Sequence, residues 1–514
     1  MKIKLLLLIF TQIAFSQAPS IQWQKCIGGT GNDNIESVFQ TLDDGYIVAG
    51  YTSSTDGSAI GNHGSPDILI VKLNATGGIQ WHKVLGGTGY DRVTKIIQST
   101  DGGFVLSGFT TSNDGDVSGN HGNIDVWVVK LNSTGDLVWQ KTYGGTSQDE
   151  GNDIIETTDG FMVAASTYST NGNVTGNHGT TDAWIIKIDF TGNLIWQKTF
   201  GGFNFDSAAS IQQTSDGGFV FAGSTNSNNG NVVGSHSTTT LDYWVVKISN
   251  LGIFQWQKCL GGSNSDEATC VQQTNDGGFI VSGYTSSTDG DVTGFIGIKD
   301  YWIVKLNATG TVLWQKTFGG TQEDYAFKIK KTNNDGFIIT GYTGSSDGSV
   351  LFNHATSLAS LDTWVLRLDA NGNEIWQKSL GNNGYQDSPD IQQTTDGGFI
   401  VAGNTGAGNV GDVTDFIGGN LDFWVVKLGP DTLSNLTFDI TNVVVYPNPA
   451  EDYIIVKNLD EDIKNVCIID SQGRMMNFIS IGGKIDLTNL KSGIYILEFK
   501  TNQNIMVRRK IIKK

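Results

Sequence analysis

The sequence contains little proline and little cysteine. Only 6 of its 514 residues are proline and 4 are cysteine, against 67 glycines. These proportions exclude a proline-rich disordered chain and a disulfide scaffold, and they indicate many tight turns. Cys26 and Cys259 stand at a position where other copies of an internal repeat have threonine, valine or serine. This position is therefore interpreted as a small packing site and not as part of a disulfide.

Helical periodicity, long apolar runs and positive charge are also scarce. After residue 16, no segment has the length and apolar content of a transmembrane helix, and the body has no sustained helical period. The chain has 33 basic and 51 acidic residues, which gives a net charge of −18. Because so acidic a body repels nucleic acid and anionic lipid, neither is expected as a partner.

The first 16 residues, MKIKLLLLIFTQIAFS, differ from the rest. Lys2 and Lys4 precede an apolar run, and the small residues Ala14 and Ser16 stand before a potential cleavage point. This pattern predicts a secretory signal peptide over residues 1–16. We therefore expect the protein to be exported through the inner membrane.

A WQK-like phrase recurs seven times along the body. Its tryptophans are 57–62 residues apart, at Trp23, Trp81, Trp139, Trp196, Trp256, Trp314 and Trp376. Internal repeats of this length are typical of solenoids, propellers and arrays. Within residues 208–260, the runs AASIQQT, FVFAGST, LDYWVVKI and FQWQKCL are separated by turn-forming residues, so each repeat is predicted to form four short strands.

Both faces of these strands are apolar. In YWVVKI, Trp244 and Val246 point to one face, while Tyr243 and Val245 point to the other. Four-stranded sheets that are covered on both faces and repeat seven times along the chain are typical of a β-propeller. The repeated tryptophans of the WQK phrases are accordingly expected to pack between blades, and not to serve as stacking platforms for sugars.

The order of the phrases predicts how the ring closes. The first WQK phrase, residues 21–27, precedes the first complete unit, whereas the last unit, Ser388 to Lys427, supplies only three strands. Pairing the two ends would remove an open sheet edge. We predict an all-β protein with a seven-bladed β-propeller over residues 17–429, whose ring is closed by the N-terminal strand. Its repeats resemble those of β-propellers in many secreted bacterial proteins.

The pattern changes after a predicted linker or processing region at residues 430–442. Residues 443–514 alternate apolar and polar residues over seven short runs, which predicts a small Ig-like β-sandwich. Four features follow in order: Tyr446-Pro447-Asn448-Pro449, a hairpin at Gly473-Arg474, LKSGIYILEF with Gly493 and Tyr495, and a basic end with Lys510, Lys513 and Lys514.

Together these features resemble the type A C-terminal sorting domain of the type IX secretion system. The resemblance implies that residues 443–514 direct passage across the outer membrane and that the type IX machinery is a partner. It also implies that the mature protein is released or attached at the cell surface.

Three sets of polar residues recur once per repeat. The first opens the innermost strand: Asp33, Asp91, Asp149, Asp206, Asp266, Asp324 and Asp387. The second opens the third strand: Asp67, Asp125, Asp182, Asp242, Asp300, Asp362 and Asp422. The third stands in loops such as GNHG: His63, His121, His178, His236 and His354.

A residue that every blade repeats is more simply explained by the needs of the blade than by a binding site. The aspartates are interpreted as caps of their own turns, although seven carboxylates near an axis could also bind cations. One histidine per blade cannot converge on a single ion. Local Ca²⁺ sites in Asp/Gly-rich loops such as residues 113–122 stay open as an alternative, and no resident metal or other cofactor is predicted.

Catalysis would require one blade to depart from the repeat. Departures occur at Arg92 and Lys95, at Lys330 and Lys331, in the insertion at residues 350–360, and at Tyr385 and Pro389. None forms a recognisable nucleophile–base pair or carboxylate pair, so no catalytic residue is predicted.

The sequence therefore favours a monomeric cell-surface or secreted protein that binds glycans or surface proteins, as in adhesion. The alternatives are a secreted polysaccharide- or protein-degrading enzyme with its site on the loop face, and a structural role in a surface layer. Convergence of the departures on one face, with titratable groups opposite one another, would distinguish the first two hypotheses.

Overall fold

The computed structural model describes residues 18–354, 360–406, 408–431, 444–457, 465–469, 475–479, 484–500 and 506–514. The chain divides into two compact units, Met1–Ser434 and Asn435–Lys514. The predicted signal peptide, and the predicted linker after residue 431, lie outside the described residues.

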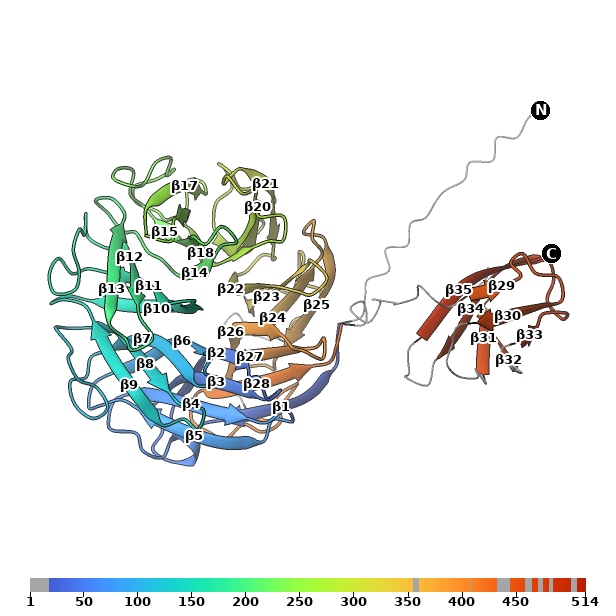
Figure 1. The fold of residues 1–514 in the computed structure, drawn as a ribbon, viewed down its shortest axis with the longest axis horizontal. Coiled ribbons are helices and arrows are strands. Elements are labelled where there is room, and N and C mark those ends of the chain that lie inside the picture. The colour runs from blue at the N-terminus through green and yellow to red at the C-terminus, as the bar shows by residue number, and fades with distance from the viewer. Residues whose placement is uncertain are drawn as a thin grey trace. The chain divides into compact units, whose positions relative to one another are not determined.

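The first unit is a ring of seven four-stranded antiparallel sheets, here called blades 1 to 7 (Figure 1). Blades 1 to 3 comprise β2(Asp33–Gln40), β3(Tyr46–Thr52), β4(Asp67–Leu73) and β5(Ile79–Leu85); β6(Asp91–Gln98), β7(Phe104–Thr110), β8(Asp125–Leu131) and β9(Leu137–Tyr143); and β10(Asp149–Thr157), β11(Gly160–Thr167), β12(Asp182–Ile188) and β13(Leu194–Phe200). Blades 4 to 6 comprise β14(Ser210–Gln213), β15(Phe219–Thr225), β16(Asp242–Ile248) and β17(Phe254–Leu260); β18(Asp266–Gln273), β19(Phe279–Thr285), β20(Asp300–Leu306) and β21(Val312–Phe318); and β22(Asp324–Lys331), β23(Phe337–Thr343), β24(Asp362–Leu368) and β25(Glu374–Leu380).

Blade 7 combines the two ends of this unit. Its strands β26(Gln386–Gln393), β27(Phe399–Thr405) and β28(Asp422–Leu428) are followed in the sheet by β1(Ile21–Ile27), which pairs antiparallel with β28. The Trp424 indole N–H donates to Gln24 Oε1 at 2.7 Å across this pair. The predicted seven-bladed ring, closed by the N-terminal strand, is confirmed.

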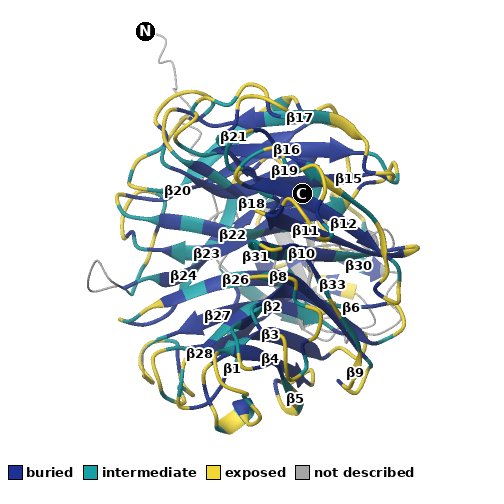
Figure 2. Ribbon diagram, turned by 90° about the vertical axis from the view of Figure 1, so that its left-hand side faces the viewer, coloured by how far each residue is buried: buried dark blue, intermediate teal, exposed yellow. Residues whose placement is uncertain are grey.

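The third strand of each blade is buried along its whole length. All seven residues of β4 and of β28 are buried, and the same holds for β8, β12, β16, β20 and β24. Figure 2 shows this contrast, with strands in dark blue and the connecting loops largely in yellow. Because each sheet is covered on both faces, both sets of alternating side chains are apolar.

The tryptophans of the WQK phrases pack between neighbouring blades. Trp81 on β5 meets Phe104 on β7 with ring centroids 5.8 Å apart. Trp376 meets Phe399 at 5.6 Å between blades 6 and 7. Such edge-on aromatic pairs contribute about 0.5–1.5 kcal/mol each beyond the burial of their area. This arrangement confirms the predicted packing role.

The repeated cysteines also pack as predicted. Cys26 and Cys259 are buried and unpaired, and each belongs to an apolar cluster between two blades. The position takes a small side chain, and in other blades the hydroxyls of Thr142, Thr199 and Thr317 donate there to loop carbonyls.

The second unit is a two-sheet sandwich. One sheet holds β29(Val444–Tyr446), β30(Tyr453–Lys457) and β33(Lys484–Asp486); the other holds β31(Asn465–Ile469), β32(Met475–Ile479), β34(Gly493–Lys500) and β35(Met506–Lys513). Apolar residues of both sheets, among them Ile454, Ile468 and Leu497, form one buried cluster. Two sheets that share one core are the predicted sandwich.

Helical structure is nearly absent from the described part of the chain, where it is limited to the single turn η1(Gly57–Ala59). None of the described residues forms a helix with the length and hydropathy that a membrane span requires.

Candidate functional site

The first set of repeated aspartates caps turns. Asp33 opens β2, is fully buried, and accepts hydrogen bonds from Gly29 N and Ser54 Oγ, each at 2.8 Å. The same two bonds form at the first-set aspartates of blades 2 to 6, although in blade 4 Asp206 lies before β14 in an isolated bridge. The predicted capping role is confirmed in these blades, because the carboxylates are saturated by their own turns.

In blade 7 the predicted member of this set was wrong. Gln386, not Asp387, occupies the capping position, and its Oε1 accepts from Asn382 N at 2.9 Å. The register of the turn decides which side chain faces inward, and it places a neutral amide where the other blades have a carboxylate. Asp387 points the other way and accepts from Tyr385 Oη at 2.8 Å and from Asn404 Nδ2 at 2.7 Å.

The second set of aspartates binds the histidine loops. Asp67 Oδ2 accepts from His63 N at 2.7 Å and lies 2.8 Å from His63 Nδ1. Each of the other four repeated histidines meets the second-set aspartate of its own blade in this way. These aspartates are fully buried, and within the described residues the Oδ1 atom of all seven has no hydrogen-bond partner.

The histidines are thus engaged locally, one per blade. In the part of the chain that the structure describes, no three His, Cys, Asp or Glu side chains group so as to hold a metal ion. Local Ca²⁺ binding in the Asp/Gly-rich loops stays a prediction.

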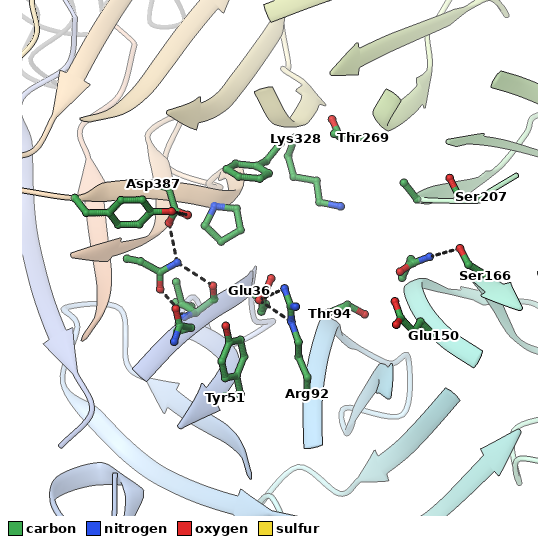
Figure 3. Close-up of a pocket in the computed structure, with 18 of the residues that line it drawn as sticks. Glu36, Tyr51, Arg92, Thr94, Glu150, Ser166, Ser207, Thr269, Lys328 and Asp387 are labelled. Atoms are coloured by element: carbon green, nitrogen blue, oxygen red, sulfur yellow. Dashed lines mark hydrogen bonds and ion pairs between the residues drawn. The ribbon is translucent and has the colours of Figure 1, made fainter. Parts of the chain in front are cut away.

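A cavity of about 550 Å³ lies where the innermost strands of the seven blades meet (Figure 3). We call it the axial cavity. In six blades the innermost strand has a register shift that leaves one residue, or in blade 7 two, without a cross-strand partner, and one such residue of each blade lines the cavity. These residues, with their counterpart in blade 4, are Glu36, Thr94, Asn152, Ala209, Thr269, Phe327 and Pro389. The side chains at this position differ from blade to blade in both size and charge.

Several charged groups of the axial cavity are held by neighbours. Arg92 Nε and Nη2 donate to Glu36 Oε1 at 3.0 and 2.6 Å, and the guanidinium carbon lies 5.2 Å from the centroid of the Tyr51 ring. Asp387 is held by Tyr385 and Asn404. Burial raises the pKa of Glu36, and the Arg92 charge does not fully offset it.

Two charged side chains that line the cavity have no hydrogen-bond or ion-pair partner among the described residues. Within the described residues, the side chains of Glu150 and Lys328 make no hydrogen bond and no ion pair. They come from blades 3 and 6, and both side chains appear in Figure 3 without a dashed contact. Burial raises the pKa of Glu150.

A buried ion pair joins two residues that directly follow the lining residues Thr94 and Pro389. Lys95 Nζ on β6 and Asp390 Oδ2 on β26 are 2.6 Å apart, and their side chains are 8% and 1% exposed. Asp390 also accepts from Ser37 Oγ at 3.0 Å. Burial opposes the charge on Asp390, but Lys95 and its neighbouring lysines hold the pKa of this carboxyl below its usual value. A buried pair needs such extra bonds to offset its desolvation.

The structure brings together several of the departures from the repeat. Arg92, Tyr385 and Pro389 line the axial cavity, and Lys95 directly follows the lining residue Thr94. Lys331 lines other hollows, with Asn275 at the junction of blades 5 and 6. Residues 355–359 of the predicted insertion lie outside the described residues.

Glu36, Glu150 and Lys328 were not predicted from the sequence as site residues. A signal was present, because Lys328 stands four residues after the first-set aspartate of its blade, as Lys95 does in blade 2. Only the register shift in the structure shows that residues about four positions after the first-set aspartate approach the axis.

In the second unit, much of the predicted sorting signal is described. Asn448 Nδ2 donates to Lys510 O at 2.8 Å, and Asn448 Oδ1 accepts from Ile512 N at 2.9 Å, so the YPNP segment is bound to the last strand. The peptide bonds before Pro447 and Pro449 are cis. Tyr495 Oη donates to Lys491 O at 2.8 Å.

Of the remaining residues of the predicted sorting signal, all but one lie in or beside the last strand. Gly493 pairs with Lys513, and Lys514 N donates to Ala450 O at 2.8 Å. Gly473 lies outside the described residues.

Residues 444–514 match the family of secretion system C-terminal sorting domains. The fold and this match together define an exported β-propeller protein. Residues 444–514 are therefore a type IX sorting domain, and this domain marks the protein for the cell surface or the extracellular space.

Other comparisons concern parts of the chain or the fold. A 188-residue stretch is 29% identical to the regulatory protein FlaEY of Caulobacter vibrioides; it covers 34% of this chain and only 19% of that protein. Among solved structures, Sqt1 from Chaetomium thermophilum has 11% identity and a TM-score of 0.43, over 80% of this chain and 99% of its own. A puromycin hydrolase has 10% identity and a TM-score of 0.45, over 95% and 62%, and YCF48 bound to a D1 peptide has 7% and 0.38, over 82% and 100%.

Proposed function

We propose that the protein is a non-catalytic binding module at the cell surface or in the medium, and that the axial cavity contacts a glycan or a surface protein. The observation that carries this proposal is the contrast between the blades and their centre. The capping, histidine-loop and tryptophan positions repeat from blade to blade, whereas the side chains that line the axial cavity differ. Side chains that depart from the repeat at one place are expected where a ligand is recognised.

The lining of the cavity suits binding. Arg92 and Asp387 are fixed by hydrogen bonds, so a ligand would meet polar groups that are already positioned. Tyr51, Phe205 and Tyr385 add aromatic surface to the lining of the cavity. Fixed polar groups beside aromatic rings are the usual composition of a recognition site.

The second candidate function is hydrolysis of a polysaccharide or protein in the same cavity. Burial raises the pKa of Glu36, Glu150 and Asp387, and carboxyls of raised pKa serve as general acids. Two of the three are engaged by Arg92 or by Tyr385 and Asn404, which favours binding over proton transfer. The hydrolase hypothesis predicts turnover of a bound polymer that Glu150→Gln abolishes, whereas the binding hypothesis predicts retention without turnover.

The first experiment is a binding screen of the mature full-length chain on glycan arrays and on outer-surface protein fractions, with and without Ca²⁺. Ala209→Trp would fill the axial cavity, because Ala209 is a small lining residue. Ala75→Trp places the same ring in an exposed turn between β4 and β5 and serves as the control.

We expect Ala209→Trp to lower binding at least tenfold and Ala75→Trp to leave it unchanged, with similar melting temperatures for both. Equal binding by the two variants would contradict the proposal that the axial cavity is the site.

A further inference from the structure

We propose that the ligand presents a carboxylate, as a uronic-acid glycan does, and that Lys328 binds it. This inference rests on the proposed function, because it assumes that the axial cavity is the binding site. It adds the chemical class of the ligand and the residue that recognises it.

Lys328 differs from the comparable lysine of blade 2. Lys95 stands at the same offset in its blade, but its ammonium is neutralised by Asp390 at 2.6 Å. Lys328 lines the axial cavity and has no such partner among the described residues (Figure 3). An ammonium has three donors, and a partly buried one without acceptors is costly unless a ligand or water supplies them.

The charge of Lys328 is maintained by its surroundings. Burial alone would lower the pKa of this lysine, but Asp153, followed by Cys270, Asp390 and Glu36, outweighs that effect and raises it. Lys328 is therefore a cation at neutral pH.

The carboxylates around Lys328 are engaged elsewhere. Asp153 Oδ2 accepts from Ile211 N at 3.0 Å, and its Oδ1 accepts from Ile154 N at 3.0 Å. Asp390 is bound by Lys95, and Glu36 by Arg92. These groups stabilise the positive charge from a distance without occupying the donors of Lys328.

The rest of the cavity suits a sugar ring that carries the carboxylate. Glu150 has no partner in the described chain and can accept hydrogen bonds from hydroxyl groups. Asn152 donates its Nδ2 to Ala208 O at 2.9 Å, which fixes the amide and leaves its Oδ1 as a further acceptor. Phe327, next to Lys328 in sequence, lines the same cavity and offers an apolar face to the ring. A volume of about 550 Å³ is within the range of small-molecule sites.

The test is titration calorimetry on the mature full-length chain. The probes are oligomers of galacturonate, guluronate and glucuronate, with uncharged galactose and glucose oligomers beside them. Lys328→Met removes the cation and Lys328→Arg keeps it. Lys331→Gln is the matched control, because it removes one charge from the end of the same strand, outside the axial cavity, and introduces the residue that other blades have there.

We expect at least one acidic oligomer to bind, Lys328→Met to weaken its binding about tenfold or more, and Lys328→Arg to recover most of the affinity, since a charge-assisted hydrogen bond is lost and restored. Lys331→Gln should bind like the parent chain.

Equal affinity of Lys328→Met and the parent for the acidic oligomer would overturn the inference. So would binding of neutral sugars or a surface protein without any acidic sugar, although the proposed binding function would then stand. If no glycan and no surface protein binds in the screen, both fail.

Discussion

Asp300 shows what happens where the histidine of the repeat is missing. Its loop has Ile296 in place of a histidine, and Asp300 Oδ2 accepts from Ile296 N at 3.0 Å. Burial raises the pKa of Asp300 to about 7, with a further contribution from Asp324. Asp422, whose loop also lacks the histidine, has a pKa raised to about 6 for the same main reason.

These values predict that the protein becomes less stable as the pH rises. A carboxyl whose pKa is higher in the folded than in the unfolded state binds its proton more tightly when folded. Its stabilising contribution is present below about pH 4 and is lost as the pH rises through about 7, at no more than about 1.4 kcal/mol per pH unit for one group.

We therefore expect the melting temperature to fall between pH 5 and pH 8, and Asp300→Asn to reduce this fall, because an amide does not ionise. Asp335→Asn, at an exposed turn, is the control. If Asp300→Asn leaves the pH dependence of the melting temperature unchanged, the pKa of Asp300 is not raised in the folded protein.

Residue identities at the axis could be only partly predicted from the sequence. Arg92, Tyr385 and Pro389 were recognised as departures because they break the repeat, and the structure brings them to one cavity. Glu36 and Glu150 were not, because no pattern shows that a polar residue in a strand turns to the axis. Asp387 was assigned to the first set by mistake. It stands one residue after the capping position, and without the register of the turn the sequence does not show which of the two residues caps it.

At the scale of elements, closure of the ring depends on β1. Its Cys26 joins a buried cluster with Trp376 of blade 6 and Trp424 of blade 7, and Gln24 accepts the indole N–H of Trp424. Without β1, the edge of β28 would be unpaired, and a strand whose residues are all buried in the ring would be exposed to solvent.

Deletion of residues 17–27 is expected to lower the melting temperature by several degrees or more and to promote aggregation. Addition of a synthetic peptide of residues 18–29 should restore part of the loss, because it can pair with β28. A melt that is unchanged by the deletion would contradict the closure, and an unrelated strand-forming peptide is the control for the rescue.

Elements were the part of the fold that the sequence predicted best. Strand number per blade, the covered faces and the closing strand all follow from the repeated WQK phrase and from the three-stranded last unit. The register shifts in the innermost strands did not follow, because a single unpaired residue leaves no mark on an apolar–polar alternation.

At the scale of the whole molecule, the two units have separate roles. The C-terminal unit marks the chain for type IX export, and this could be predicted because its signal is a local series of residues. The ligand could not be predicted in the same way, because the cavity is lined by one to four residues from each blade, brought together only when the ring closes.

The proposed function requires a ligand to bind on the axis of the propeller. The most direct measurement is a crystal structure of the mature full-length chain with the ligand that the screen identifies. We predict density in the axial cavity, in contact with innermost-strand residues of several blades and with an acidic group of the ligand at Lys328. Density confined to the outer loops or to the C-terminal unit, with an empty axial cavity, would contradict the account.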